Sequence, residues 1–136
     1  MEKMEKKIGR SEKVDFPELN IGSIKSKIDT GAYGIALHVD NIKVENGQLI
    51  FFIENNEYRY NKYKMISVKS SFGRKQKRYS IFTKIKIGET TYKFFVSLTD
   101  RKNMRYPVLI GRRFLYKFGY LVDVRQKNIY DTTKKV

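Results

Sequence analysis

Two short segments, far apart in the chain, constrain its fold more than any other feature. Residues 28–32 read Ile-Asp-Thr-Gly-Ala, and residues 108–112 read Val-Leu-Ile-Gly-Arg. The first is an apolar strand that runs into an acidic turn, and the second is an apolar strand that ends at a glycine. Because glycine has no Cβ, the backbone at Gly31 can approach a carboxylate closely. The pair predicts a strand-rich fold in which the second strand packs across the loop at Asp29 and holds it rigid.

The acidic turn carries residue types that suit amide hydrolysis. Without a metal or a covalent intermediate, hydrolysis needs one group that takes a proton from water and another that gives one. Two carboxyls that share a proton do both, because like charges about 3 Å apart cannot both ionise. Such a dyad titrates as a unit. We therefore expect Asp29 to be catalytic, with Thr30 holding the loop through its hydroxyl and Gly31 giving close backbone access.

A pair of carboxylates requires a second copy of this chain, because Asp-Thr-Gly occurs only once in it. The expected active unit is a two-fold homodimer with a self-complementary interface. At 136 residues, one domain is expected. We place it over residues 8–130, with flexible tails at residues 1–7 and 131–136.

The charge balance narrows the class of partner. The net charge is +15, from 29 basic and 14 acidic residues, which favours nucleic acid, the ribosome, anionic lipid or an acidic peptide. The absence of cysteine excludes a disulfide framework and a thiolate metal site. Residues 1–7 are charged, and no apolar stretch is long enough to span a membrane. A cytoplasmic protein is expected.

Alternation and turn residues predict an all-β fold with one short C-terminal helix. Asn46-Gly47 and Gly88-Glu89-Thr90 are tight-hairpin signals. A helix is expected over residues 112–118, ended by Gly119. The predicted strands cover residues 19–28, 35–39, 42–44, 49–53, 79–87, 91–98 and 121–124, the last of which closes the sheet.

Further motifs are spread over residues 8–130. They are Ile8-Gly9-Arg10, Phe16-Pro17-Glu18-Leu19, Lys27-Ile28-Asp29-Thr30-Gly31-Ala32, Ala36-Leu37-His38, Val68-Lys69-Ser70-Ser71-Phe72-Gly73, Ser97-Leu98-Thr99-Asp100-Arg101, Tyr106-Pro107, Leu109-Ile110-Gly111-Arg112 and Leu121-Val122-Asp123. This set resembles the bacterial family labelled "ATP-dependent zinc protease", whose members are retropepsin-like and include the RimB-type proteases. The resemblance implies a retropepsin-like closed β-barrel that is active as a homodimer.

The resemblance also implies a substrate and a partner. Some members are fused to, or encoded beside, a RimK-type ATP-grasp ligase that adds glutamates to the C-terminus of a ribosomal protein. RimB-type members are implicated in trimming that tail. An aspartic peptidase acting on acidic proteins or peptides, such as a glutamylated ribosomal protein, is therefore implied, with a functional link to a glutamate ligase.

The family label does not fit the residues of this chain. Catalytic zinc sites usually use at least two His or Cys ligands, whereas this chain has one histidine and no cysteine. No Gly-x-x-x-x-Gly-Lys-Ser/Thr loop for ATP phosphates occurs either. We therefore expect neither a metal nor another cofactor.

By analogy with retropepsins, a flap is expected at residues 70–78, where four residues are basic. If the flap borders the active-site cleft, it makes one wall of the cleft basic. Such a wall would suit carboxylate side chains of a substrate, because Arg and Lys bind them through charge-assisted hydrogen bonds. The expected substrate-binding residues are Ala32, Ser71, Gly73, Arg74, Lys75, Arg78, Arg101 and Arg105, and the expected supports of the site are Leu109, Ile110, Gly111 and Arg112. A solvated, charged hairpin is the alternative interpretation of the same segment.

Other features have simpler explanations. His38 falls on the face opposite Ile35 and Leu37, which favours a structural or surface role over catalysis. Residues 58–64 interleave tyrosines with basic residues, as surfaces that stack single-stranded nucleic acid do. A solvated strand edge accounts for that segment more simply.

The sequence departs from the family pattern beside the acidic turn. Members usually have a basic residue and then Thr-Ser after Asp-Thr-Gly-Ala, whereas Tyr33, Gly34 and Ile35 stand here. This affects the expected substrate more than the acid–base groups. The alternative function is a non-catalytic binding module that docks RNA or the ribosome through its basic surface.

Overall fold

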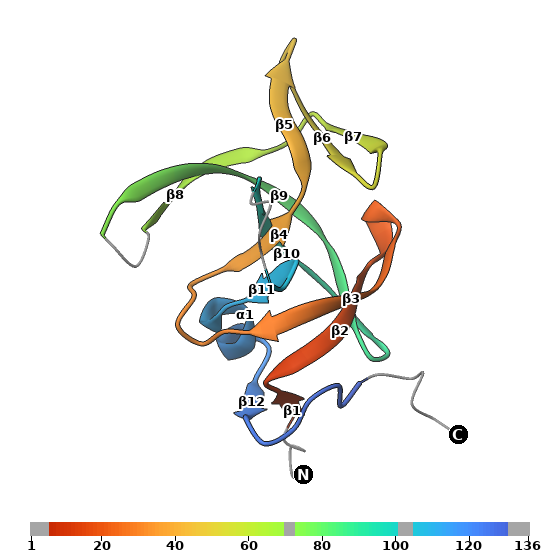
Figure 1. Ribbon diagram of the computed structural model, residues 1–136, viewed down its shortest axis with the longest axis vertical. Coiled ribbons are helices and arrows are strands. Elements are labelled where there is room, and N and C mark those ends of the chain that lie inside the picture. Colours follow the sequence, from red (N-terminus) through yellow and green to blue (C-terminus); the bar gives the residue numbers. More distant parts are fainter. Residues whose placement is uncertain (1–5, 70–72, 101–104, 131–136) are drawn as a thin grey trace.

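Short strands joined by tight turns dominate the computed structural model, which describes residues 6–69, 73–100 and 105–130 (Figure 1). These residues contain one turn of 3-10 helix, η1, and one short α-helix, α1. In chain order the elements are β1 (Lys6–Gly9), β2 (Ser11–Phe16), η1 (Pro17–Leu19), β3 (Ile21–Ile28), β4 (Ile35–His38), β5 (Asp40–Glu45), β6 (Gln48–Ile53), β7 (Asn56–Tyr60), β8 (Lys64–Lys69), β9 (Lys75–Ile87), β10 (Thr90–Thr99), β11 (Val108–Ile110), α1 (Arg112–Lys117) and β12 (Tyr120–Asp123).

Six strands close into a barrel in the order β10-β4-β11-β3-β2-β9, because β9 pairs back onto β10. Strand β8 extends this sheet from β9, and β5, β6 and β7 form a separate three-stranded sheet. The prediction of an all-β closed barrel with one short C-terminal helix is confirmed. Figure 1 shows the β5–β7 sheet at one end of the molecule and the pair β1 and β12 at the other.

Both predicted hairpins are present. Asn46 and Gly47 have φ values of 49° and 77° and join β5 to β6. Two successive left-handed residues are what a type I′ turn requires, and its twist matches that of the flanking strands. Gly88, with φ of 61°, lies in the turn between β9 and β10, where Ile87 pairs with Thr90. The predicted helix is confirmed, and Gly119 follows it with φ of 72°.

Two sequence predictions differ from the structure at the chain ends. Residues 121–124 were expected to close the main sheet, but β12 pairs in parallel with β1 in a sheet of two strands. Lys6 and Lys7, expected in a tail, belong to β1. The pairing joins opposite ends of the chain and gives no local sequence pattern. The expected tail at residues 131–136 lies outside the described residues.

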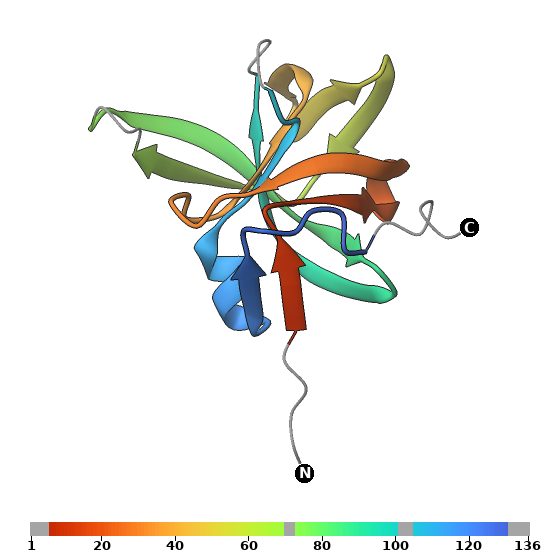
Figure 2. The ribbon, with the colours of Figure 1, turned by 60° about the horizontal axis from the view of Figure 1, so that its bottom comes forward.

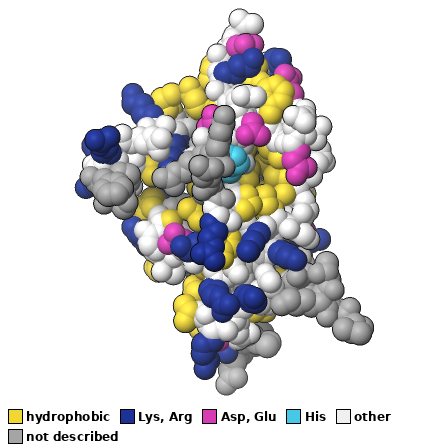
Figure 3. All heavy atoms as spheres, viewed as in Figure 1, with side chains coloured by type: hydrophobic (Ala, Val, Ile, Leu, Met, Phe, Trp, Pro, Cys, Tyr) yellow, Lys and Arg dark blue, Asp and Glu magenta, His cyan; other side chains and the backbone are white. Residues whose placement is uncertain are grey.

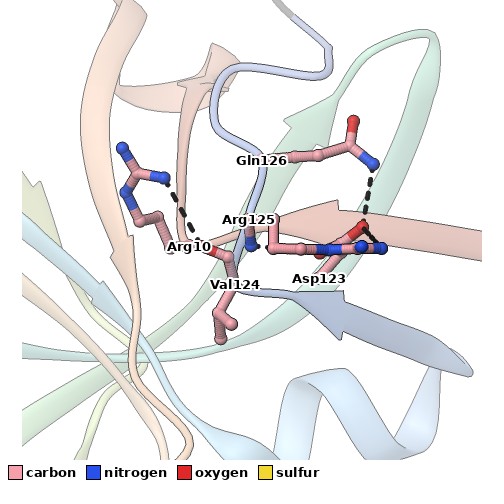
Figure 4. A network of polar contacts seen from close by, with 5 residues as sticks. All are labelled: Arg10, Asp123, Val124, Arg125 and Gln126. Carbon is pink, nitrogen blue, oxygen red and sulfur yellow. Dashed lines mark hydrogen bonds and ion pairs between the residues drawn. The ribbon is translucent and has the colours of Figure 1, made fainter.

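The segment after β12 crosses the corner between β1 and β2 (Figure 4). Arg10 donates from its backbone to the Gln126 carbonyl at 2.8 Å and from its side chain to the Val124 carbonyl at 3.4 Å. Asp123 accepts hydrogen bonds from the side chains of Gln126 and Arg125. These bonds hold the pKa of Asp123 well below its usual range. The carboxylate thus fixes the turn that brings the C-terminal segment back.

The barrel interior continues into an aromatic cluster beneath α1. Phe114 is fully buried, and its ring lies 4.9–6.1 Å from the rings of Tyr92, Phe94, Phe118 and Tyr120. The hydroxyls of Tyr92 and Tyr120 are 2.6 Å apart. Burial of the hydroxyl raises the pKa of Tyr120, and this hydrogen bond raises it further. The cluster anchors the helix that follows Gly111 to the strand β10.

A buried carboxylate joins the two ends of the chain. Glu12 is fully buried, and its two oxygens accept hydrogen bonds from the backbone N–H groups of Gly9 at 2.8 Å and Tyr130 at 3.2 Å. Unpaired backbone groups are costly in the interior. Glu12 therefore satisfies one donor from each end of the domain.

We predict that Glu12→Gln lowers the free energy of unfolding by about 1–3 kcal/mol, because a side-chain amide offers one acceptor oxygen to two backbone donors, one buried and one partly buried. Urea denaturation monitored by circular dichroism measures the change. Glu45→Gln is the matched control, since Glu45 is exposed and forms a surface ion pair with Lys43. The control should change stability by less than about 0.5 kcal/mol. Equal stability of both variants and the wild-type protein would contradict the assigned role.

Candidate active site

The strand register brings the two segments singled out in the sequence to the same place. Strand β11 pairs in parallel with β3, with Ile110 opposite Ile28, and antiparallel with β4, with Ile110 opposite Ile35. Parallel strands end at the same edge of a sheet. Asp29, which follows β3, therefore lies close to Gly111, which follows β11. The loop 29–34 leaves from that edge and returns to it at β4.

Hydrogen bonds hold the Asp29 loop on both sides. The backbone N–H of Asp29 donates to the carbonyl of Ile110 at 2.9 Å. The Gly31 N–H donates to Oδ1 of Asp29 at 3.1 Å, and the Ala32 N–H donates to the Asp29 carbonyl at 3.0 Å. The carboxylate is thus oriented by its own turn, while its backbone is tied to β11. The Asp29 side chain is half-buried.

Gly111 lets α1 begin directly against this loop. A Cβ on Gly111 would lie 2.5 Å from the Gly34 carbonyl oxygen and 2.6 Å from that of Ala32. The close approach allows the backbone N–H groups of Arg112 and Arg113 to donate to the carbonyls of Ala32 and Tyr33, at 2.9 and 3.1 Å. The expected supporting residues Leu109, Ile110, Gly111 and Arg112 therefore lie along the strand and turn that contact the loop.

Arginine side chains surround the exposed part of the loop. Nη1 of Arg112 donates to the Gly31 carbonyl at 3.2 Å. The guanidinium groups of Arg112 and Arg113 also lie 5.3 and 5.2 Å from the centre of the Tyr33 ring, which is 60% exposed. Such stacking is favourable because the ring face is negative. Two positive groups are therefore held beside the Asp29 turn.

Sequence reasoning treated Tyr33 as a departure from the family pattern and did not consider Arg113. The available signal was an aromatic residue directly after the first segment, together with the two arginines that follow the glycine of the second. That signal acquires meaning only once the two segments are known to lie together.

Thr30 behaves differently from its neighbours. It is exposed, and within the described residues its hydroxyl has no hydrogen-bond partner. The hydrogen bond expected of this hydroxyl is therefore not seen among the described residues. The loop is held instead by main-chain hydrogen bonds and by Arg112.

The expected flap coincides with a long hairpin. Strands β8 and β9 pair from Lys64–Ser80 to Lys69–Lys75. Gly73 at its tip has φ of 79°, and Arg74 and Lys75 are exposed. Figures 1 and 2 show that the hairpin extends on the same side of the barrel as the loop 29–34.

The other expected substrate contacts are distributed as follows. Ala32 is part of the Asp29 turn, Arg78 donates to the Gln76 side chain within the hairpin, and Arg105 is exposed. Ser71 and Arg101 lie outside the described residues. On the face drawn in Figure 3, most acidic side chains lie at the upper end, over β5–β7, together with some basic ones, while Lys and Arg predominate at the hairpin end and in the lower half.

Two other candidates have structural surroundings. His38 lies in β4, and its Nε2 is 3.8 Å from Oδ1 of Asp40. Within the described residues, no group of three or more His, Cys, Asp or Glu side chains could hold a metal ion. Tyr58 and Tyr60 stack on Phe51, and the Tyr58 hydroxyl donates to the Leu19 carbonyl at 2.7 Å. Their rings pack against the core, so they are not solvated as the strand-edge interpretation expected, although β7 is an edge strand of its sheet.

In the described part of the chain, no helix is long and apolar enough to cross a membrane.

We predict that Gly111→Ala lowers the free energy of unfolding by about 1–3 kcal/mol, because the added methyl group meets backbone atoms that cannot rotate away. Urea denaturation measures this effect. Gly34→Ala is the matched control, since a Cβ there would meet no atom within 4 Å. Comparable destabilisation by both substitutions would contradict the tight contact at Gly111.

Known proteins show the same architecture. A crystal structure of the Legionella pneumophila protein Lpg0085, described as of unknown function (DUF785), superposes with a TM-score of 0.72 and 27% sequence identity. The match covers 94% of this chain and 100% of that one.

Two curated proteins named "Probable alpha-L-glutamate ligase" also match. They come from Shewanella pealeana and Desulfotalea psychrophila, and they are 31% and 28% identical to this chain. The matches cover 77% of this chain but only 26% and 25% of those proteins. The chain therefore spans about a quarter of the length of these relatives.

A family model described as "Retropepsin-like aspartic endopeptidase RimB" matches residues 7–133. This range includes the barrel, the Asp29 loop and the hairpin β8–β9. The chain therefore belongs to the RimB-like family of retropepsin-like proteins.

Proposed function

We propose that this protein is a cytoplasmic, homodimeric aspartic peptidase that cleaves acidic protein tails, including polyglutamate C-termini. The observation that carries the proposal is the oriented carboxylate of Asp29. It lies on a turn that is tied to β11 by a 2.9 Å hydrogen bond and buttressed by Gly111. Membership of the RimB-like family supports the same activity.

In this mechanism two copies of Asp29 share one proton across the dimer axis. The ionised carboxylate takes a proton from water as the water attacks the scissile carbonyl carbon. The protonated carboxyl stabilises the developing oxyanion by donating a hydrogen bond. The carboxyl that took the proton from water gives it to the leaving nitrogen as the C–N bond breaks, and the dyad returns to its shared-proton state. Rigid loops matter because a misplacement of about 1 Å can cost about a hundredfold in rate.

The surface of the single chain suits a symmetric partner at the Asp29 loop. The chain contains one Asp-Thr-Gly, and Thr30 and Gly31 are exposed beside the half-buried carboxylate. In a two-fold dimer the two loops would face one another. The Thr30 hydroxyl, which is exposed in one chain, would then be positioned to bond across the axis.

Acidic substrates suit the charges around this loop. Arg112 and Arg113 lie beside Tyr33, and the β8–β9 hairpin presents Arg74 and Lys75 at its tip. Carboxylates form charge-assisted hydrogen bonds with such groups. The names of the two ligase relatives support a link to glutamate addition, and a peptidase in the same setting would remove what a ligase adds.

We predict that the wild-type protein shortens a peptide ending in several glutamates and that Asp29→Asn lowers the rate by about a hundredfold or more. The asparagine amide cannot share or accept the proton. It is nearly the same size as the carboxylate, so the turn is preserved. Mass spectrometry of the peptide, from about pH 4 to about pH 8, measures the products. The profile should be bell-shaped, because only the singly protonated dyad is active.

The controls separate chemistry from folding and charge. Asp40→Asn removes an exposed carboxylate from another strand and should leave the rate unchanged. A peptide ending in lysines tests selectivity and should remain intact. Equal cleavage by wild-type protein and Asp29→Asn would contradict the proposed mechanism, and cleavage of the lysine peptide at the same rate would contradict the acidic substrate.

A further inference from the structure

An exposed pair of phenylalanines lies on the outer face of the barrel, on strands β9 and β10. Phe82 and Phe95 are directly opposite each other, with ring centres 4.9 Å apart. Their neighbours Ile81, Thr83, Phe94 and Val96 are buried, as alternation along a strand requires. Yet Phe82 is 49% exposed and Phe95 is 41% exposed. The pair therefore contributes two aromatic faces to the surface rather than to the core.

Lysines border this pair in an arrangement that is unfavourable for an isolated chain. Lys84 lies directly opposite Lys93, one step along the same face. Like charges in directly opposed positions destabilise a sheet. The ammonium groups of Lys64 and Lys93 also lie 4.4 and 5.8 Å from the ring centres of Phe95 and Phe82. Positive charge and aromatic rings thus occupy one continuous strip.

Two acidic residues, Glu18 and Asp15, lie beside strand β9. Glu18 accepts hydrogen bonds from the backbone N–H of Lys84 at 3.1 Å and from the Thr83 hydroxyl at 3.3 Å. Asp15 lies opposite Lys86 and accepts from the Ser23 backbone. Within the described residues, neither carboxylate forms an ion pair with Lys84 or Lys93.

We propose that this strip, formed by Phe82, Phe95, Lys64, Lys84 and Lys93, binds single-stranded nucleic acid. Bases would stack on the two rings, and the lysines would contact the phosphates. Aromatic residues on an exposed sheet face flanked by positive charge are an arrangement that binds single strands. The strip contains no residue of the Asp29 loop, so this inference does not rest on the proposed peptidase activity.

Charge and chemistry favour this occupant over others. A second copy docked on the same strip would place lysines against lysines. An apolar partner would bury those lysines without compensation. An acidic peptide would satisfy the charges but would leave the phenylalanine faces without stacking partners. A single strand supplies both negative charge and flat rings.

Fluorescence anisotropy of a labelled oligouridylate of about a dozen nucleotides tests the proposal. We expect the wild-type protein to bind it, and Phe82→Leu with Phe95→Leu to bind at least about tenfold more weakly, because leucine keeps the apolar bulk but has no flat ring. Tyr116→Ala is the matched control, since Tyr116 is 91% exposed on α1. Asp29→Asn should also bind like the wild-type protein. Circular dichroism confirms that each variant is folded.

Further probes separate stacking from charge. Heparin carries negative charge without bases, so its affinity should not change in the double leucine variant. Lys84→Gln with Lys93→Gln should reduce the slope of log affinity against log salt by about 1.4, from about 0.7 for each lost phosphate contact. Unchanged oligouridylate binding in the leucine variant would overturn the proposal. So would a polyglutamate that binds more tightly than the oligonucleotide and is weakened by the same leucine substitutions, since the strip would then be a site for acidic protein.

Discussion

The parallel pairing of β3 with β11 is the constraint on which the site depends. Ile28 and Ile110 lie opposite each other, so the acidic turn and Gly111 leave the sheet at the same point. The hydrogen bond from the Asp29 backbone to the Ile110 carbonyl then fixes the turn. Because Gly111 has no side chain, α1 can start against the same loop. One register thus determines the position of the carboxylate, the helix and the two arginines beside Tyr33.

The distribution of charge gives the basic composition a more specific meaning. Arg112 and Arg113 lie at the Asp29 loop, and Arg74 and Lys75 at the hairpin tip. A second group of cations borders Phe82 and Phe95 on the outer face. The first group suits carboxylates of a peptide substrate, and the second suits phosphates of a single strand. The two proposals use different residues, and each can fail without the other.

Local sequence signals predicted the parts of the fold that are determined locally. Asn46-Gly47 and the glycine at position 88 specify their turns through left-handed backbone angles, and both hairpins were predicted. The pairing of β1 with β12 was missed, because it joins distant residues in parallel and leaves no pattern in either strand. Glu12 was also missed, since its two partners, Gly9 and Tyr130, are brought together only by the complete fold.

The candidate site was predictable to the extent that its residues lie in the two opening segments. Asp29, Gly31 and Gly111 were found from those segments, while the stacking of Arg113 on Tyr33 required the distance between them. The Phe82–Phe95 pair was hidden, because a strand with aromatic residues on both faces is not distinguished from an ordinary buried strand by composition. Exposure, rather than residue type, reveals it.

The central claim is that catalysis requires one Asp29 from each of two chains. Subunit mixing tests it most directly, by measuring peptide cleavage in mixtures of wild-type protein and Asp29→Asn after subunit exchange at constant total concentration. In an equal mixture, random pairing leaves about one quarter of the dimers with two aspartates. The account predicts that activity falls to about one quarter of the wild-type value. Activity that falls only to about one half, in proportion to the wild-type chains, would contradict it.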